Sequence, residues 1–179
     1  MSSNKKISDI IDFNPKRPIK KGDTHPFIEM AALPVNSRDI NKLDKREFKG
    51  GGSKFKNGDT LFARITPCLE NGKTAKVNCL HDGEYGHGST EFIVMAAKNP
   101  DFDEDYIYYL ARQPEFRAYA QSLMEGTSGR QRVAWQSLAE FEFNYPNKNI
   151  RKTVGGFVKI IDDKIAINTQ INQTLEQIA

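Results

Sequence analysis

The sequence has few cysteines and no long hydrophobic run. Two cysteines among 179 residues, Cys68 and Cys79, cannot build a disulfide framework, so we expect a protein of the reducing cytoplasm. No apolar run approaches the roughly 18–20 residues of a membrane-spanning helix. Residues 1–6 are mostly polar and no apolar stretch follows them, so we expect neither a secretory signal nor a membrane partner.

The motifs of DNA-acting enzymes are also missing. An adenine methyltransferase needs a glycine-rich cofactor motif and an Asn/Asp-Pro-Pro-aromatic element, and Asn144-Tyr145-Pro146 has the wrong order. A metal-dependent nuclease needs clustered acids beside a lysine. Asp59, Glu70 and Lys73 form only a loose version of this cluster, which a turn at Asn71-Gly72 also explains. We therefore expect no catalytic residues, and keep a DNA-cleaving or DNA-modifying enzyme module as the alternative.

Possible metal ligands are present without a metal-binding spacing. Cys68, Cys79, His81 and His87 lie close together in the sequence, but no Cys-x-x-Cys pair occurs and the spacings match no common zinc site. We expect small buried cysteines and surface histidines here, and neither a metal nor a cofactor in this chain.

The composition is that of a folded globular protein, with an uneven charge distribution. Hydrophobic residues make up 38% and charged residues 27% of the chain. Residues 1–76 contain 16 Lys and Arg against 9 Asp and Glu, whereas residues 77–150 contain 6 against 11. A basic front part favours a polyanionic partner, although a solvated surface would have the same composition.

The pattern of apolar residues predicts a mixed α/β globular domain over residues 1–150. Short apolar or alternating runs predict strands at residues 26–30, 60–65, 74–77, 89–95 and 141–146. Acidic residues before an aromatic run and a proline at a first turn predict helices at residues 104–112 and 114–124. Residues 1–25 and 36–57 have little periodicity, and we expect extended or loop structure there.

Residues 151–179 differ from the rest, because they predict one long helix that forms a coiled coil. The helix is expected from Thr153 to Ile178, where no proline interrupts the pattern. A heptad seam with alternating spacings of four and three is formed by Val154, Val158, Ile161, Ile165, Asn168, Asn172 and Leu175. The two asparagines favour a partner helix, since asparagine in a seam commonly fixes register. The alternative is a terminal helix packed into its own domain.

A glycine-bounded loop over residues 126–132 has the side chains that nucleic-acid-binding proteins use. Arginine and glutamine can bond base edges, and hydroxyls and backbone N–H groups can bond phosphates. The candidate DNA-binding residues are Lys54, Lys56, Arg64, Lys73, Lys76, Ser128, Arg130, Gln131 and Arg132. The other interpretation is a solvated turn with incidental charge.

Several longer stretches, in the same order, resemble one family. They are Phe13-Asn14-Pro15, Met30-Ala31-Ala32-Leu33-Pro34, Gly58-Asp59-Thr60-Leu61-Phe62-Ala63-Arg64-Ile65-Thr66-Pro67-Cys68-Leu69-Glu70-Asn71-Gly72-Lys73, Gly86-His87-Gly88-Ser89-Thr90-Glu91-Phe92, Gly126-Thr127-Ser128-Gly129-Arg130-Gln131-Arg132-Val133 and the tail from Ile161 to Ala179. Together they resemble the specificity (S) subunit of type I restriction-modification systems. The chain resembles one half of it, with a single target-recognition domain and a single helical region.

The resemblance implies an α/β domain that reads one half of a split double-stranded DNA target and is itself non-catalytic. In such systems, methyl transfer from S-adenosylmethionine belongs to modification subunits, and ATP- and Mg-dependent cleavage belongs to the restriction subunit. These subunits are the implied partners. One departure is the helix entry: a Pro- and Glu-Gln-rich segment is usual, but residues 147–152 read Asn-Lys-Asn-Ile-Arg-Lys.

The resemblance and the seam lead to a homodimer hypothesis. Two antiparallel terminal helices would place two recognition domains at opposite ends. A helix of about 26 residues is about 39 Å long, near the roughly 34–36 Å of one DNA turn. A different half-subunit or a modification subunit could cover the same helix instead, and a purely structural adaptor is a third class of function.

Overall fold

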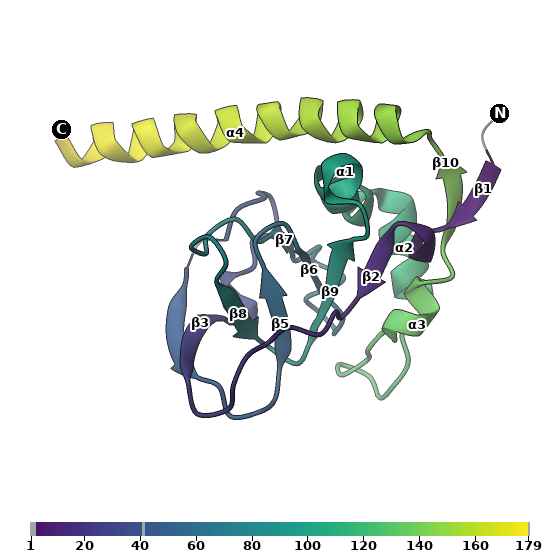
Figure 1. The fold of residues 1–179 in the computed structure, drawn as a ribbon, viewed down its shortest axis with the longest axis horizontal. Coiled ribbons are helices and arrows are strands. Elements are labelled where there is room, and N and C mark those ends of the chain that lie inside the picture. The colour runs from purple at the N-terminus through teal and green to yellow at the C-terminus, as the bar shows by residue number, and fades with distance from the viewer. Residues whose placement is uncertain (1–2, 41, 179) are drawn as a thin grey trace.

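The structure, a computed structural model, describes residues 3–40 and 42–178. Its globular part combines small sheets with short helices, and one long helix, α4 (Lys148–Ile178), lies along one side (Figure 1). This arrangement confirms the predicted mixed α/β domain followed by a long terminal helix. Among the described residues, none of the helices is both long enough and apolar enough to cross a membrane.

The central sheet has the strand order β2 (Ile11–Phe13), β9 (Phe92–Ala97), β6 (Thr60–Ala63) and β7 (Thr74–Lys76), and all its pairs are antiparallel. β6 and β9 are almost entirely buried, which explains why they appear in the sequence as continuous apolar runs. The strands predicted at residues 60–65 and 74–77 are confirmed, and β6 pairs directly with β7 across the predicted turn at Asn71-Gly72.

A second four-stranded sheet has the order β4 (Asp44–Glu47), β3 (Thr24–Ile28), β8 (Tyr85–Gly88) and β5 (Ser53–Lys56). β3 and β8 run parallel, and the other two pairs are antiparallel. This sheet lies beside the central one, farther from the N-terminus (Figure 1).

A small third sheet joins the start of the chain to the segment that leads into α4. β1 (Ser3–Lys6) pairs antiparallel with β10 (Glu142–Tyr145). A 3-10 turn, η1 (Ile7–Asp9), follows β1, and the Ile7 amide donates to the carbonyl of Phe141 at 2.8 Å. The N-terminal segment is therefore fixed to the base of the long helix.

Three further helices and one more 3-10 turn complete the globular part. They are α1 (Pro100–Arg112), α2 (Pro114–Ser122), α3 (Trp135–Leu138) and η2 (Met30–Ala32). Each of α1 and α2 begins with proline, whose missing N–H costs nothing at a helix start. Both predicted helices are confirmed, but α1 begins earlier than the predicted residue 104.

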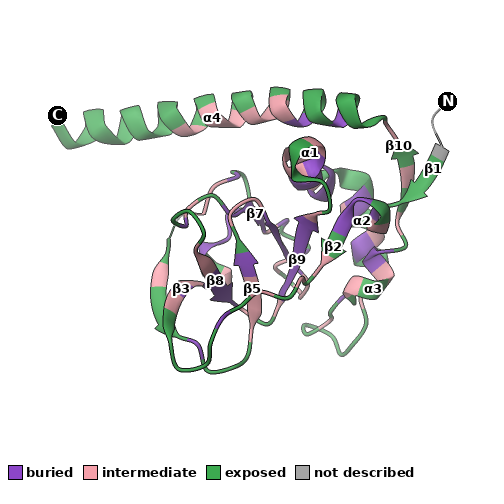
Figure 2. Ribbon diagram, in the orientation of Figure 1, coloured by how far each residue is buried: buried purple, intermediate pink, exposed green. Residues whose placement is uncertain are grey.

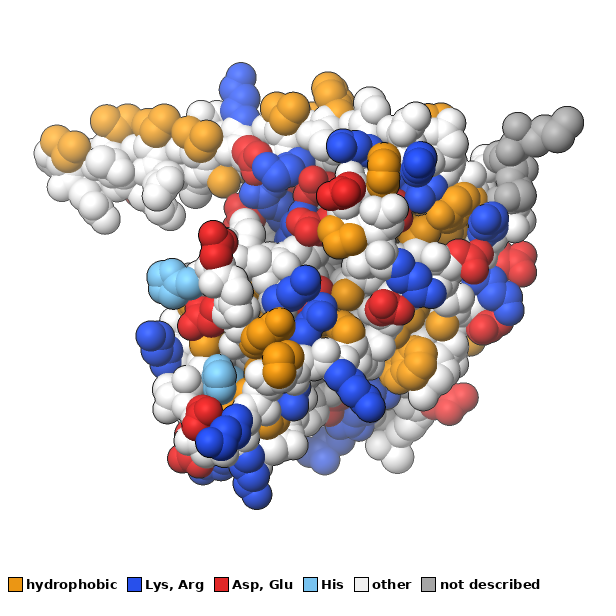
Figure 3. Space-filling view, viewed as in Figure 1, with side chains coloured by type: hydrophobic (Ala, Val, Ile, Leu, Met, Phe, Trp, Pro, Cys, Tyr) orange, Lys and Arg blue, Asp and Glu red, His pale blue; other side chains and the backbone are white. Residues whose placement is uncertain are grey.

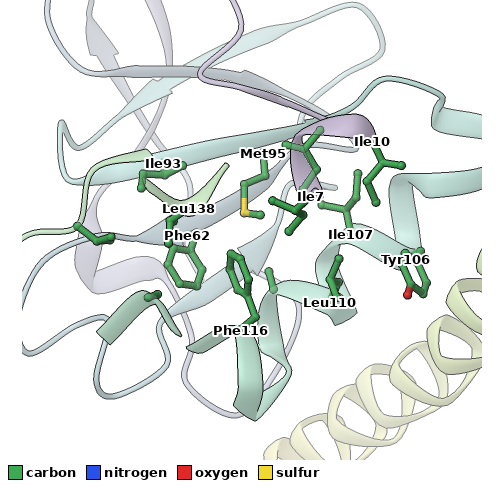
Figure 4. Packing of buried hydrophobic residues seen from close by; sticks show 14 of the residues in the cluster. Ile7, Ile10, Phe62, Ile93, Met95, Tyr106, Ile107, Leu110, Phe116 and Leu138 are labelled. Carbon is green, nitrogen blue, oxygen red and sulfur yellow. The ribbon is translucent and has the colours of Figure 1, made fainter. Parts of the chain in front are cut away.

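The central sheet separates two hydrophobic clusters because alternate side chains of its strands point to opposite faces. In β6, Phe62 belongs to the cluster under α1 and α2, whereas Leu61 belongs to the cluster that faces the second sheet. In the larger cluster, Phe62 packs edge-on against Phe116 of α2, and Met95 of β9 and Ile107 of α1 lie close by (Figure 4).

Two segments for which no strand was predicted contain strands. Residues 1–25 include β1 and β2, and residues 36–57 include β4 and β5. Both predictions were wrong for the same reason. These strands lie at sheet edges or in the two-stranded sheet, and β1 and β4 have mostly exposed side chains, so they have no apolar alternation.

α4 is held against α1 by close packing, an ion pair and a hydrogen bond. Gly155 lies so near α1 that a Cβ there would be 2.7 Å from the Tyr106 backbone nitrogen. The guanidinium of Arg151 bonds both carboxylate oxygens of Asp103, and these two residues are 4% and 2% exposed. Farther along, the Tyr109 hydroxyl donates to Asp162 at 2.8 Å.

The opposite side of α4 is apolar and uncovered. Figure 2 shows that most of α4 is exposed, and Figure 3 shows hydrophobic side chains along the helix, on the side away from the globular part and towards its C-terminal end. The exposed apolar residues of the helix are Ile150, Val154, Phe157, Ile160, Ile161, Ile165, Ile167, Ile171, Leu175 and Ile178. The isoleucines are therefore not sheltered by their own domain. This is the reverse of an ordinary surface helix, whose apolar side faces its own core.

Two adjacent glycines provide a test of the close helix contact. Gly155→Ala is expected to push α4 away from α1, because the new methyl group would overlap the backbone of Tyr106. Gly156→Ala meets nothing within 4 Å, and should stabilise the helix by about 0.5–1 kcal/mol. Thermal melts of both variants check this. Equal effects from the two substitutions would contradict the packing described here.

Candidate DNA interface

A basic cleft lies where the lead-in to β3, the loop before β5 and the end of β6 meet. Its volume is about 520 Å³. Its lining contains four cations and no acid, and consists of Asn14, Pro15, Lys16, Arg17, Gly52, Ser53, Lys54, Arg64, Thr90 and Phe92. We call it the glycine-loop cleft, after the loop at residues 50–52. A cationic lining of this kind fits an anionic ligand.

Local backbone geometry fixes two walls of this cleft. Asn14 has a left-handed backbone (φ 48°), and its side-chain oxygen accepts from the Val94 amide at 2.9 Å. Gly52 has φ 94°, and a Cβ there would be 2.2 Å from the Gly88 carbonyl oxygen. Only glycine can occupy that position, so the loop is held tightly against β8.

The four cations of the cleft differ in what already neutralises them. The Nη2 of Arg17 donates to both oxygens of Asp59, at 2.8 and 2.9 Å. Burial raises the pKa of Asp59, and the charge of Arg17 partly opposes this shift. Lys16, Lys54 and Arg64 form no ion pair among residues 3–40 and 42–178, and the buried Nε of Arg64 has no hydrogen-bond partner there.

A second cleft of about 600 Å³ continues along the other side of the loop. It shares Gly52 and Thr90 with the glycine-loop cleft and adds Arg46 and Lys49. Several basic side chains lie along the lower edge of the molecule, at the end away from α4 (Figure 3). The sequence analysis missed Lys16, Arg17, Arg46 and Lys49 as candidate residues. The signal was present in the excess of basic residues over residues 1–76.

His87 in this second cleft is buried, so the prediction of a surface histidine was wrong at this position. Its ring contacts the edges of Phe27 and Phe48, and its Nε2 donates to the Arg46 carbonyl oxygen at 3.1 Å. Burial lowers the pKa of His87. Both cysteines are half-buried.

The lowered pKa of His87 predicts a loss of stability in mild acid. In the unfolded chain the His87 imidazole binds a proton near pH 6.5, whereas in the folded protein it does so only at lower pH. The free energy of unfolding therefore has its full value above about pH 6.5 and falls as the pH drops through the pKa of the folded state. Urea unfolding of His87→Gln should therefore depend less on pH between 7 and 5 than that of the wild type. The control is His81→Gln, at an exposed site, which should keep the wild-type pH dependence. If the free energy of unfolding of His87→Gln changed with pH as steeply as that of the wild type, the pKa shift of His87 would be refuted.

The loop predicted to bind nucleic acid, residues 126–132, projects from the globular part before α3 (Figure 1). Glu125 and Arg132 close it by exchanging backbone hydrogen bonds of 3.0 and 2.8 Å. Ser128 and Arg130 are exposed, and Gln131 is half-buried. The loop therefore presents a guanidinium and hydroxyls on a closed, narrow base. We call it the reading loop.

Arg132 supports the reading loop and does not project freely. Its Nε and Nη2 donate to the carboxylate of Glu91 at 3.0 and 2.8 Å. The Val133 amide donates to the Arg64 carbonyl at 3.0 Å, and the Arg64 amide donates to the Glu91 carbonyl at 3.0 Å. The base of the reading loop and the wall of the glycine-loop cleft are thus joined by direct hydrogen bonds.

The remaining candidate lysines lie elsewhere. Lys76 is 6% exposed and forms ion pairs with Glu104 and Asp105 of α1, on the side of α4. Lys73 donates from Nζ to the Met30 carbonyl at 3.0 Å. Lys56 is exposed beside a smaller cleft next to Asp59. Of the predicted set, the structure brings Lys54 and Arg64 together in one cleft and Ser128, Arg130, Gln131 and Arg132 together in one loop.

The loose nuclease-like set is not assembled as an active site. The carboxylate of Asp59 accepts from Arg17 and from the Lys56 amide, and Lys73 is occupied by a carbonyl oxygen. In the part of the chain that the structure describes, no group of three or more His, Cys, Asp or Glu residues could hold a metal ion.

Comparison with known protein families shows which family this chain matches. Residues 2–177 match the type I restriction modification DNA specificity domain. The chain belongs to this family. Specificity subunits of type I restriction enzymes are similar in sequence: EcoEI of Escherichia coli is 28% identical over 87% of this chain, and HindI of Haemophilus influenzae is 32% identical over 70%.

The fold agrees with solved structures of the same family. The HsdS subunit of Thermoanaerobacter tengcongensis matches 98% of this chain with a TM-score of 0.71 at 15% identity. A chain from a study of complex assembly in the type I R-M system also matches 98%, with a TM-score of 0.69 at 14% identity. This chain spans 27% of the length of the EcoEI and HindI subunits, and 45% of the Thermoanaerobacter chain.

Proposed function

We propose that this chain is a DNA-binding specificity half-subunit that reads one half of a bipartite target and directs modification and restriction subunits to it. The family match over residues 2–177 carries this proposal. The glycine-loop cleft and the reading loop support it, since they present free cations and an exposed arginine at the end of the molecule away from α4. In this role the chain itself is non-catalytic, cytoplasmic and free of cofactors.

The reading loop is the proposed base-reading element. Arg130→Ala is expected to reduce the preference for the target over unrelated duplex by about 1–3 kcal/mol, the usual value of one bidentate base contact. A binding assay with the full chain and a selected duplex measures this. Arg132→Ala should act differently, since it releases Glu91 and loosens the loop. If both variants keep full affinity and preference, the assignment fails.

Dimerisation through α4 is the second part of the proposal. The predicted seam from Val154 to Leu175 lies mainly on exposed helix surface, with only Val158 half-buried. α4 has 31 residues, a length of about 46 Å, so it exceeds one turn of DNA. A second copy is the proposed occupant, and a different half-subunit or a modification subunit is the alternative occupant of this surface.

The enzyme alternative has less support from the contacts described above. Asp59 and Lys73 are bound to other groups in the folded protein. Magnesium-dependent cleavage of DNA by the purified chain alone would establish that alternative.

A further inference from the structure

The glycine-loop cleft and the reading loop differ in the bonding groups they offer. In the cleft, the Asn14 side-chain oxygen is already bonded to the Val94 amide, and the single proton of the Ser53 hydroxyl is shared between the carbonyl oxygens of Ser89 and Phe92, at 3.0 and 2.8 Å. The lining therefore offers mainly positive charge. Base edges are distinguished by patterns of donors and acceptors, whereas phosphates are recognised by charge.

Three of the four cleft cations are available for a ligand. Arg17 is bound to Asp59 and serves to hold the wall in place. Lys16 is exposed, and Lys54 and Arg64 are half-buried. The Nζ of Lys54 lies 4.7 Å from the centre of the Phe48 ring, which limits where it can point. A half-buried cation without a counter-charge is costly unless an anion completes the site.

The cleft is also rigidly connected to the reading loop. Arg64 lies just after β6, and its carbonyl accepts from Val133, directly beyond the loop. The Thr66 amide donates to the Gln131 carbonyl at 3.0 Å, which ties the same segment to the loop a second time. A group held at Arg64 would therefore set the position of the loop relative to the DNA.

We propose that the glycine-loop cleft binds backbone phosphates of the DNA, with one phosphate contact from each of Lys16, Lys54 and Arg64, and thereby sets the register in which the reading loop meets the bases. This inference rests on the proposed function. It assigns backbone affinity and sequence preference to separate groups of residues. Lys16, Lys54 and Arg64 contribute affinity for any duplex. The loop contributes the preference for one sequence.

The test is the salt dependence of DNA binding by the full chain. For Lys16→Gln, Lys54→Gln and Arg64→Gln, affinity for target and non-target duplex should fall alike, by about tenfold each. Each variant should also lower the slope of log K against log salt by about 0.9, the value for one phosphate contact. Lys152→Gln on α4 removes the same charge far from the cleft and should keep the wild-type slope.

Two further variants keep the test independent of folding. Arg64→Lys retains the charge and should retain the slope, and Lys54→Gln with Arg64→Gln should lower it by about 1.8. Thermal melts identify any variant that has unfolded. An unchanged slope in folded variants would overturn the phosphate site, and a collapse of target preference would show that the cleft reads bases instead.

The outcomes also separate this inference from the proposed function. If the wild type binds all duplexes equally but the slope of log K against log salt is smaller in the variants, the phosphate site stands and the specificity role fails. If preference is strong and the slopes do not change, the cleft inference alone fails. Inorganic phosphate added at constant ionic strength should not displace the duplex.

Discussion

Arg151→Met is expected to destabilise the protein by about 3–5 kcal/mol, because it leaves the carboxylate of Asp103 buried without its partner. Arg151 also donates to the Pro146 carbonyl at 2.6 Å and lies over the ring of Tyr145, so the substitution loosens the start of α4 as well. For a chain of this size, each kcal/mol lowers the melting temperature by about 2–4 °C. Thermal unfolding followed by circular dichroism measures the change.

The neighbouring Lys152 provides the control for this experiment. Lys152→Met removes a charge at an exposed position on the same helical turn, and should change stability by less than about 0.5 kcal/mol. The double variant Asp103→Asn with Arg151→Met should recover part of the loss, since it removes the unpaired charge. A loss below 1 kcal/mol in Arg151→Met would show that the buried pair does not hold α4 in place.

Charged residues on the outer side of α4 are expected to abolish the proposed dimer while leaving the fold intact. In Ile165→Lys with Leu175→Lys, both altered side chains are exposed in the single chain. Each buried aliphatic side chain contributes about 1.5–3 kcal/mol, and a two-fold axis counts each change twice. The dissociation constant should rise by more than about a thousandfold. Sedimentation equilibrium at micromolar concentration measures it.

A matched control lies on the same part of the helix. Gln173→Lys adds one charge on the side turned away from the seam, and should leave the dimer intact. Circular dichroism should show unchanged helix content in all variants. A monomeric wild type, or a double variant that still dimerises, would contradict a self-pairing helix.

Elements with strong local patterns could be predicted from the sequence, and elements that depend on distant partners could not. β6 and β9 are apolar runs bounded by turn residues, and α1 has acids and proline at its start. β1 has no such signal, since it exists through pairing with β10 at the far end of the domain.

The start of α4 shows a signal that was present but not used. The predicted helix began at Thr153, whereas α4 begins at Lys148. The side-chain oxygen of Asn147 accepts from the Ile150 amide at 3.0 Å, which is an ordinary N-cap. The unusual helix entry in this sequence is therefore explained by a capping asparagine.

The candidate site was predicted only in part, because charge in a sequence does not reveal pairing. Lys76 appears in the sequence as a basic residue beside a hairpin, but it is buried against the acids of α1. Arg64 and Lys54 come from different strands, and only the fold brings them to one cleft. Residues of the reading loop were found because they are contiguous.

The reading loop and α4 emerge from opposite ends of the globular part, with the central sheet between them (Figure 1). The reading loop is closed on itself by the backbone bonds between Glu125 and Arg132. Substitutions within residues 127–131 are therefore expected to leave α4 unchanged. Under the proposed function, varying this short segment alone should change the preferred duplex while the rest of the domain and α4 stay constant.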